Sequence, residues 1–355
     1  MPQTARAGRT GDVVAVVSQS GPTVSFFDAV SDRHLDTVET LAEPHELCFD
    51  PTHRLLWCAN TYRGGYYHAN AGRRSELTVI DPDTRQIVEV VDLAPEHGPH
   101  GLALDVARGR LYVSVEGSRT RVGGVVIVDT ATRRVLDRID TEAPGPHWFV
   151  ASPDGMTGYA SNKEAPFVSV VDLLGGTLTD RIEVPGGEGL AVSQDGARVY
   201  LASPYASFGG ARPETAPGIR VIDTKTRSVV ETLPTDDLVV PVHLTTTGKL
   251  LAGEVRMASG DGSGNAHAEP GQLRTPGQLT VFSAESHEKA GSIDVGRCPL
   301  TIISSPDGAL GYVASVIDST VHVIDLDAMS CLARLDIAKL GEPGAHGLAY
   351  IPRAA

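Results

Sequence analysis

Apolar residues recur along most of the chain in short alternating runs, which are separated by turn residues. Five segments repeat one arrangement: an apolar run, a turn with Pro, Asp or Gly, and a second apolar run that carries an aromatic residue. These segments are PHELCFDPTHRLLWCAN, PHGLALDVARGRLYVSV, PHWFVASPDGMTGYASN, GEGLAVSQDGARVYLAS and CPLTIISSPDGALGYVAS. Alternation interrupted by such turns is typical of β-hairpins. The pattern therefore predicts a pair of antiparallel strands in each segment.

A second pair of strands is predicted after each hairpin. The segments that carry it are ELTVIDPDTRQIVEVVDL, GVVIVDTATRRVLDRIDT, FVSVVDLLGGTLTDRIEV, GIRVIDTKTRSVVETLPT and TVHVIDLDAMSCLARLDI. Each has a strand similar to Val-x-Val-Ile-Asp, a polar turn and a return strand. Units of four antiparallel strands that recur every 41 to 57 residues indicate the blades of a β-propeller, whose period is roughly 40–45 residues.

The two ends of the chain together supply one further blade. Residues 12–41 contain three strands with no first strand before them, and residues 345–352 form a first strand with nothing after it. Joining these ends closes the ring and removes its exposed edges. We therefore predict an all-β, seven-bladed propeller as a single domain over residues 1–355. Blade 1 combines residues 12–41 and 345–352, and blades 2–7 begin at about residues 44, 99, 146, 187, 240 and 299.

The combination of an SPDG turn, a YVAS strand and a Val-x-Val-Ile-Asp strand resembles the YVTN family of seven-bladed β-propellers. The resemblance covers essentially the whole chain, and it implies the same propeller fold. The functions of that family are diverse, so the resemblance does not imply a particular activity.

The first strand of each blade lines the central channel, so the residues that begin these strands should form a ring at one mouth. The ring residues read from the repeat are His45, His100, His147, Glu188, Leu300 and His346. In blade 6, counting back from Gly248 gives Val240, whereas a shortened turn gives His243, and we favour His243. The glycine of the repeated His-Gly-Leu-Ala is interpreted as permissive backbone.

Histidine is concentrated in this ring. Twelve histidines in 355 residues predict about a quarter of one in seven positions, yet four or five occur there. Converging neutral imidazoles suit Fe or Cu, with Zn, Ni or Mn possible, better than Ca or Mg. The predicted metal ligands are His45, His100, His147, His243 and His346. Glu188 and His243 are the predicted acid/base residues. The competing interpretation is that the histidines are structural or bind water.

Four Gly-rich insertions are predicted to surround this mouth: YRGGYYHANAGRRSE, GSRTRVGG, YASFGGARPETAPG and RMASGDGSGNAHAEPGQLRTPGQ. The candidate substrate-binding residues on this rim are Tyr62, Arg63, Tyr67, Glu116, Trp148, Glu164 and Glu254. Asn60, Glu116, Glu164 and Glu254 are also candidate acceptors for imidazole N–H groups. Weaker candidates are Tyr66, His68, Arg73, His97, Phe208, Arg212 and His267. The remaining histidines, His34, His53, His287 and His322, are predicted on the outer surface.

Charge and composition exclude some classes of function. The net charge of −14 argues against a nucleic-acid partner or an anionic membrane surface, because both need a basic face. No apolar run has the length of a signal or transmembrane segment, so we expect a cytoplasmic protein. Four scattered cysteines suggest neither a disulfide framework nor a cysteine zinc site.

The sequence thus predicts a metal-dependent enzyme that acts on a small organic molecule at the channel mouth. An Fe- or Cu-dependent oxidase or oxygenase is favoured, because an all-histidine site with open positions suits redox chemistry. Two alternatives stay open: a metal-assisted lyase, isomerase or hydrolase at the same site, and a non-catalytic binding or scaffold propeller.

Overall fold

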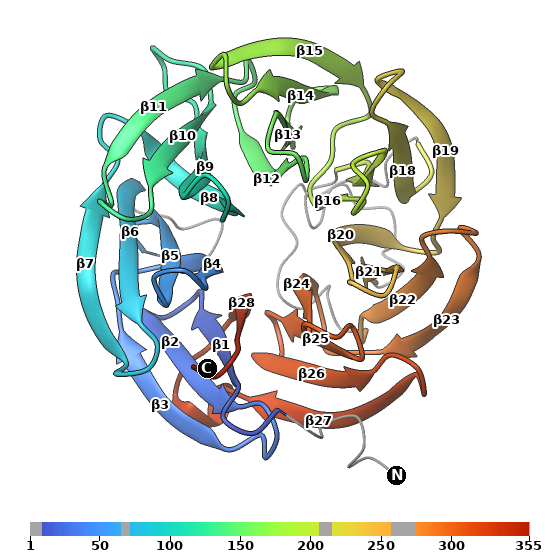
Figure 1. Cartoon of the computed structure of the whole chain (residues 1–355). Coiled ribbons are helices and arrows are strands. Elements are labelled where there is room, and N and C mark those ends of the chain that lie inside the picture. The colour runs from blue at the N-terminus through green and yellow to red at the C-terminus, as the bar shows by residue number, and fades with distance from the viewer. Residues whose placement is uncertain (1–8, 65–71, 206–214, 257–274, 355) are drawn as a thin grey trace, which may run out of the picture.

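The computed structural model describes residues 9–64, 72–205, 215–256 and 275–354. In these residues the strands form seven separate sheets of four antiparallel strands, arranged around one central axis (Figure 1). This arrangement confirms the all-β, seven-bladed propeller predicted from the repeats. Among the described residues, no helix is long and apolar enough to cross a lipid bilayer.

Each blade runs from an inner strand at the channel to an outer strand at the rim. Blade 1 contains β28 (Ala345–Ile351), β1 (Val13–Ser18), β2 (Thr23–Asp28) and β3 (His34–Glu39). Blade 2 contains β4 (Pro44–Asp50), β5 (Leu55–Tyr62), β6 (Arg73–Asp81) and β7 (Gln86–Asp92). Blade 3 contains β8 (His97–Asp105), β9 (Arg110–Glu116), β10 (Gly124–Asp129) and β11 (Val135–Asp140).

Blades 4 to 7 follow in chain order. Blade 4 contains β12 (Pro146–Ala151), β13 (Thr157–Asn162), β14 (Phe167–Asp172) and β15 (Thr177–Glu183), and blade 5 contains β16 (Leu190–Val192), β17 (Arg198–Ser203), β18 (Gly218–Asp223) and β19 (Ser228–Pro234). Blade 6 contains β20 (Leu238–Leu244), β21 (Lys249–Val255), β22 (Gln278–Ser283) and β23 (Lys289–Asp294). Blade 7 contains β24 (Pro299–Ser304), β25 (Leu310–Ser315), β26 (Thr320–Asp325) and β27 (Ser330–Asp336). A single 3₁₀ turn, Ala338–Leu340, precedes β28 among the described residues.

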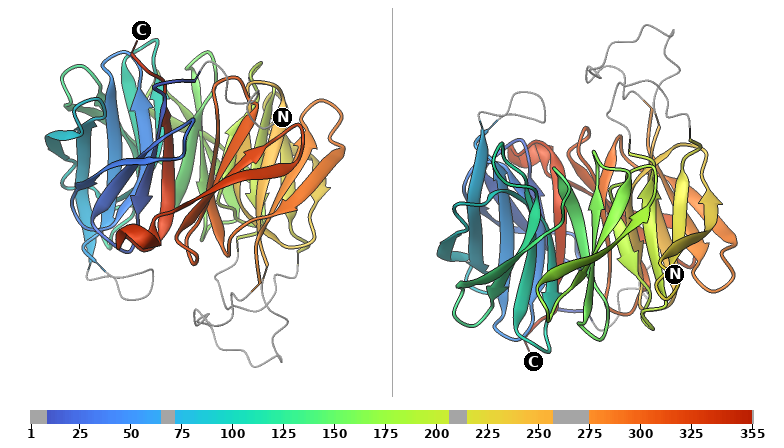
Figure 2. Two further views of the ribbon diagram at one scale, coloured as in Figure 1. Left: turned by 90° about the horizontal axis from the view of Figure 1, so that it is seen from below. Right: turned by 90° about the horizontal axis from the view of Figure 1, so that it is seen from above.

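The two ends of the chain close the ring. Strand β28 pairs antiparallel with β1, and the pairs run from Val13 opposite Ile351 to Ser18 opposite Ala345. Figure 2 shows β28 beside the N-terminal strands at the wall of a short cylinder. This pairing confirms the closure predicted from the strand count. It also covers the edge of β1 that would otherwise be unpaired.

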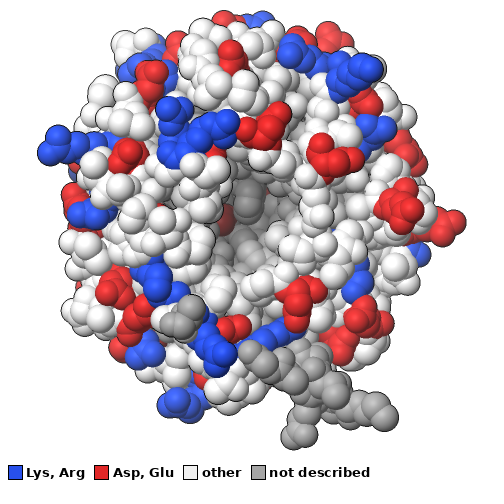
Figure 3. All heavy atoms as spheres, in the orientation of Figure 1, with Lys and Arg blue, Asp and Glu red and all other residues white. Residues whose placement is uncertain are grey.

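Alternating side chains of the middle strands join neighbouring blades. In β5, Leu56 packs with Phe26 of blade 1, whereas the adjacent Trp57 packs with Val113 of blade 3. Successive side chains of a strand point to opposite faces of its sheet, which explains this division. The apolar core therefore lies between blades and leaves the channel to the first strands. In the space-filling view the centre of the ring is hollowed, and acidic and basic residues are intermingled around it (Figure 3).

In three blades the residue directly after the ring residue is a glycine, at a point where the backbones of two adjacent blades approach closely. A Cβ atom on Gly101 would lie 2.7 Å from the carbonyl oxygen of His147, and one on Gly189 would lie 2.5 Å from that of Val240. Gly347 is equally confined by the carbonyl oxygen of His45. The expectation of merely permissive backbone was therefore wrong, because none of these glycines has a positive φ. They are required by the close approach of two backbones.

The substitution Gly101→Ala should therefore lower the free energy of unfolding by about 1–3 kcal/mol, because the added methyl group forces two inner strands apart. Gly145→Ala is the matched control, since a Cβ atom there would meet nothing within 4 Å. Urea unfolding of both variants measures the difference. Equal unfolding midpoints would show that the blades can separate without cost.

Candidate metal centre

Four histidines meet at one side of the channel. His346, His45, His100 and His147 begin the inner strands of blades 1 to 4, which are consecutive in the ring. Their ring centroids are 4.4 Å apart for His346 and His45, 4.7 Å for His45 and His100, and 4.5 Å for His100 and His147. All four side chains are buried. The repeat therefore placed these four residues together correctly, and we refer to them as the histidine arc.

The structure places Val240, and not His243, at the sixth ring position. Val240 lines the same cavity as Leu300 and three histidines of the arc, whereas His243 pairs with Leu251 in β21 and has its Nε2 3.0 Å from the Ser304 hydroxyl. The assignment of His243 as metal ligand and acid/base residue was wrong, because it assumed a shortened turn. The turn closes normally, with the amide of Gly248 donating to the carbonyl of Thr245.

The potential ligand atoms form two overlapping groups of three. The first group is His45, His100 and His147, and the second is His45, Glu46 and His346; in each group the ligand atoms lie within 4.8 Å of one another. Glu46 was not predicted, because strict alternation would turn it away from its neighbour His45. A register shift between Pro44 and Leu47 in β4 breaks that alternation. The arc is therefore a curved row of ligands with a carboxylate at one end.

Burial keeps His45, His100 and His147 uncharged and leaves nitrogen lone pairs available. Desolvation lowers the pKa of His45, His100 and His147, and nearby positive groups lower that of His45 and His147 further. His100 donates from Nε2 to Glu116 at 2.9 Å, and its buried Nδ1 has no hydrogen-bond partner among the described residues. Within the same described set, neither ring nitrogen of His147 has a partner. Such atoms fit a metal ion, which binds neutral imidazole.

The other two histidines are held by contacts to Nδ1. The Nδ1 of His346 lies 3.1 Å from the carbonyl oxygen of His45 and 3.2 Å from Oε1 of Glu46. The Nδ1 of His45 lies 3.0 Å from the buried side-chain amide of Gln19. A half-turn of that amide presents its oxygen to an Nδ1–H and leaves Nε2 as the ligand atom. Gln19 follows β1, and no motif in the sequence singled it out.

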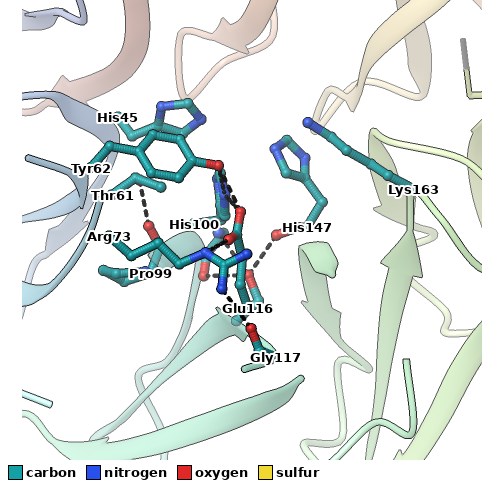
Figure 4. Close-up of polar contacts among 12 residues, drawn as sticks. His45, Thr61, Tyr62, Arg73, Pro99, His100, Glu116, Gly117, His147 and Lys163 are labelled. Carbon is teal, nitrogen blue, oxygen red and sulfur yellow. Dashed lines mark hydrogen bonds and ion pairs between the residues drawn. The ribbon is translucent and has the colours of Figure 1, made fainter. Parts of the chain in front are cut away.

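Glu116 organises the arc from the side of blade 3. It accepts hydrogen bonds from His100 and, at 2.7 Å, from the Tyr62 hydroxyl, and it forms an ion pair with Arg73 (Figure 4). Burial alone would raise the pKa of Glu116, but these three partners lower it to about 2. The carboxylate therefore stays charged and fixes the orientation of the His100 ring, as carboxylates do behind metal-bound histidines.

A buried ion pair stands at the next ring position. Glu188 of blade 5 accepts from the Lys163 ammonium at 2.6 Å, and the ammonium also lies 5.6 Å from the centre of the Tyr205 ring. Burial opposes the charge of Lys163, but the attraction of Glu188 raises its pKa. Sequence reasoning missed Lys163 and named its exposed neighbour Glu164, because both residues follow the end of β13.

Serine hydroxyls fix the ring residues of the following blade. Ser114 Oγ accepts from the amide of Gly101 at 2.8 Å and donates to the carbonyl of His147 at 2.5 Å. Ser161 Oγ accepts from the amide of Trp148 at 3.1 Å and donates to the carbonyl of Glu188. These inter-blade bonds fix the backbone of His147 near the start of β12 and that of Glu188 just before β16.

Glu43 is a further residue near the site that the sequence did not reveal. Its side chain is 2% exposed, and neither carboxyl oxygen has a hydrogen-bond partner in the described part of the chain. Its φ is 54°, which lies in the left-handed region. The equivalent position in three other blades, two residues before the ring residue, is a glycine with positive φ: Gly98, Gly186 and Gly344. Burial, assisted by the charge of Glu116, raises the pKa of Glu43 to about 8. A strained, neutral carboxylic acid therefore lies beside the Glu116 network.

Three histidines of the arc, His100, His147 and His346, line a cavity of about 310 Å³, whereas His45 is not among its lining residues. Of the predicted rim residues, Tyr62, Glu116, Trp148 and Glu164 line it, as do Glu188, Arg73 and Lys163. Two predicted residues do not. Arg63 is directed to the carbonyl of Arg73 at 3.3 Å, and Glu254 is buried within blade 6, where it accepts from the amide of Asp237 at 3.1 Å. Asn60 also turns inward, to Thr78.

Some predicted residues fall elsewhere. His97 pairs with Glu116 in the sheet and does not line the cavity. The remaining candidates lie outside the described residues; they are Tyr66, Tyr67, His68, Phe208, Arg212 and His267.

Comparison with known proteins supports the fold. No family model matches the chain. The chain is 24% identical over 301 residues to the seven-bladed beta-propeller protein Rv1057 of Mycobacterium tuberculosis, and the match covers 85% of this chain and 64% of that protein. The structure of the present chain is similar to that of hydrazine synthase from Kuenenia stuttgartiensis, with a TM-score of 0.62 and 16% identity over 91% of this chain and 90% of that chain. At this identity the structural likeness concerns the fold alone.

Proposed function

We propose that the histidine arc holds a transition-metal ion and that the protein is a metal-dependent enzyme for a small organic molecule. One observation carries the proposal: the ring nitrogens of His147 and Nδ1 of His100 are buried beside His45 without hydrogen-bond partners among the described residues. A buried polar atom without a partner costs about 1–3 kcal/mol. A metal ion removes that cost, and a set of neutral imidazoles is the donor set that such ions prefer.

The donor set favours Fe or Cu, with Zn, Ni or Mn as alternatives. His45, His100 and His147 would hold the ion, and His346 and Glu46 lie next to them in the arc. When bound, the ion would supply redox or Lewis-acid chemistry at positions open to the cavity. Glu116 keeps the His100 ring in place, Tyr62 donates to that carboxylate, and the Lys163–Glu188 pair holds a proton at the cavity wall.

An oxidase or oxygenase is our first choice of reaction class, because imidazole-rich open sites suit Fe and Cu redox chemistry. The proton held between Lys163 and Glu188 supports a second candidate, a metal-assisted lyase, isomerase or hydrolase, since such reactions need an acid or base at the substrate. Oxygen uptake by Fe- or Cu-loaded protein with candidate substrates would separate the two. Membership of the YVTN family and a cytoplasmic location remain predictions from the sequence.

Metal content tests the proposal directly. Protein prepared anaerobically with Fe²⁺ or Cu⁺ should hold about one ion per chain, as measured by inductively coupled plasma mass spectrometry. His147→Ala should lose the ion, because it removes one ligand from the group of His45, His100 and His147, and its melting temperature should stay close to that of the metal-free wild type. His53→Ala is the matched control, since His53 bonds Asp50 at an outer turn. Equal and low metal content in all three proteins would exclude the centre.

A further inference from the structure

The cavity has two chemically different walls. His346, His100 and His147 of the arc form one wall, together with Tyr62 and Arg73 of blade 2. Val240 and Leu300 form the other, and they belong to an apolar cluster with Cys298 and Val316. A ligand that fills about 310 Å³ therefore meets polar ligands on one side and an apolar surface on the other. Such a division favours a molecule with one polar end and an apolar body.

The Lys163 ammonium stands between these walls. It is directed towards the side of the cavity on which His147 lies (Figure 4), and its side chain is 22% exposed. Glu188 accepts one of its three N–H groups, and no other side chain in the described part of the chain accepts a second. The ammonium therefore keeps donors for a bound molecule.

The fixed charges of the cavity favour an anion once a metal ion is present. Below the rim, Lys163 and Arg73 are balanced by Glu188 and Glu116, while Glu164 is exposed at the rim. A divalent ion on neutral imidazoles adds two positive charges, and Glu46 behind the arc offsets one of them. The interior would then carry a net positive charge that faces the Lys163 ammonium. Like charges in a poorly hydrated space repel strongly, and an anion placed between them relieves that repulsion.

We infer that the site takes a small monocarboxylate with an apolar body. Its carboxylate lies between Lys163 and the arc, and its body lies against Val240, Leu300 and Trp148. This inference rests on the proposed function, since the ion supplies half of the positive field. It assigns Lys163 as the residue that selects a carboxylate over an uncharged group of the same shape.

Benzoate and benzamide are a suitable pair of probes, because they have the same shape and differ in charge. Calorimetric titration of Zn²⁺-loaded protein should show benzoate binding at least tenfold more tightly than benzamide. Lys163→Met should weaken benzoate at least tenfold and leave benzamide unchanged, whereas Lys163→Arg, which keeps the charge, should stay within about threefold of the wild type. Lys249→Met is the control for a lost ammonium outside the cavity, since Lys249 pairs with the exposed Asp327.

The double variant Lys163→Met/Glu188→Gln guards against misfolding, because it leaves no buried unpaired carboxylate. It too should lose the preference for benzoate. Equal affinity for the two probes in wild-type protein, or unchanged benzoate affinity in both Lys163 variants that lack the charge, would overturn the inference. Zinc content of each sample separates this result from the proposed function. Zinc retained without selective benzoate binding overturns the inference alone, whereas protein that holds no ion after loading with Zn²⁺, Fe²⁺ or Cu⁺ overturns the metal centre and the inference with it.

Discussion

Deletion of residues 345–355 should abolish the cooperative folding of the propeller. The deletion removes β28, the inner strand of blade 1, and with it the buried side chains of Leu348 and Ile351. It also exposes the hydrogen-bonding edge of β1. Burial of two such side chains is worth about 3–6 kcal/mol, and the lost strand pairing adds to this, so the total is comparable to the 5–15 kcal/mol by which domains are stable. Thermal unfolding followed by circular dichroism measures the effect.

The control is deletion of residues 354–355 alone, which lie beyond the last strand. That protein should melt within a few degrees of the full chain. If the longer deletion kept a single sharp transition near the same temperature, ring closure by β28 would not be what holds the blades together.

Metal-free protein should be most stable near pH 6.5 and should lose on the order of 4 kcal/mol of unfolding free energy between pH 6.5 and pH 5. Burial lowers the pKa of His45, His100 and His147 below the ordinary 6.5, and that of His243 to about 4. Below pH 6.5 these histidines therefore bind protons in the unfolded chain but not in the folded chain, which favours unfolding as the pH falls. Each such histidine costs up to about 1.4 kcal/mol per pH unit as the pH falls.

Glu43 acts in the opposite direction. Its pKa is raised from 4.5 to about 8, so its protonated form stabilises the folded state below pH 4.5, and that contribution disappears as the pH rises through 8. Between pH 6.5 and pH 8.5 the wild type should lose about 2 kcal/mol. Glu43→Gln should flatten this alkaline limb, and His243→Gln should shrink the acid limb by about a quarter. Urea titrations in EDTA at pH 5, 6.5 and 8.5 measure all three proteins. A stability that stays level from pH 6.5 to pH 5 would contradict neutral buried histidines.

The propeller was predictable because its information is local and repeated. Each hairpin is encoded by alternating apolar residues and a turn, and the same strands recur from Pro44 to Asp336. Closure followed from counting strands, because an incomplete blade at each end has one arrangement that satisfies both edges. The close approach at Gly101 and Gly347 depends on the distance between two blades, and the pattern within one blade carries no record of that distance.

The candidate site was predictable only where it follows the repeat. The four histidines of the arc occupy equivalent positions, so alignment of the blades found them. Glu46 escaped because a strand irregularity reverses the alternation, and His243 was misplaced because one turn length was assumed. Lys163 and Glu43 lie in connections, where the direction of a side chain depends on tertiary packing. Glu254 was assigned to the mouth from its strand position, although its side chain turns into blade 6.

The strand that closes the ring carries one of the four histidines. His346 of β28 stands next to His45 of β4, so the arc crosses the seam where the two distant parts of the chain meet. An ion bound to both sides of the seam would act as a staple, since its binding energy adds to the stability of the closed ring. The concentration of available metal would then set the stability of the closed ring as well as the activity at the cavity.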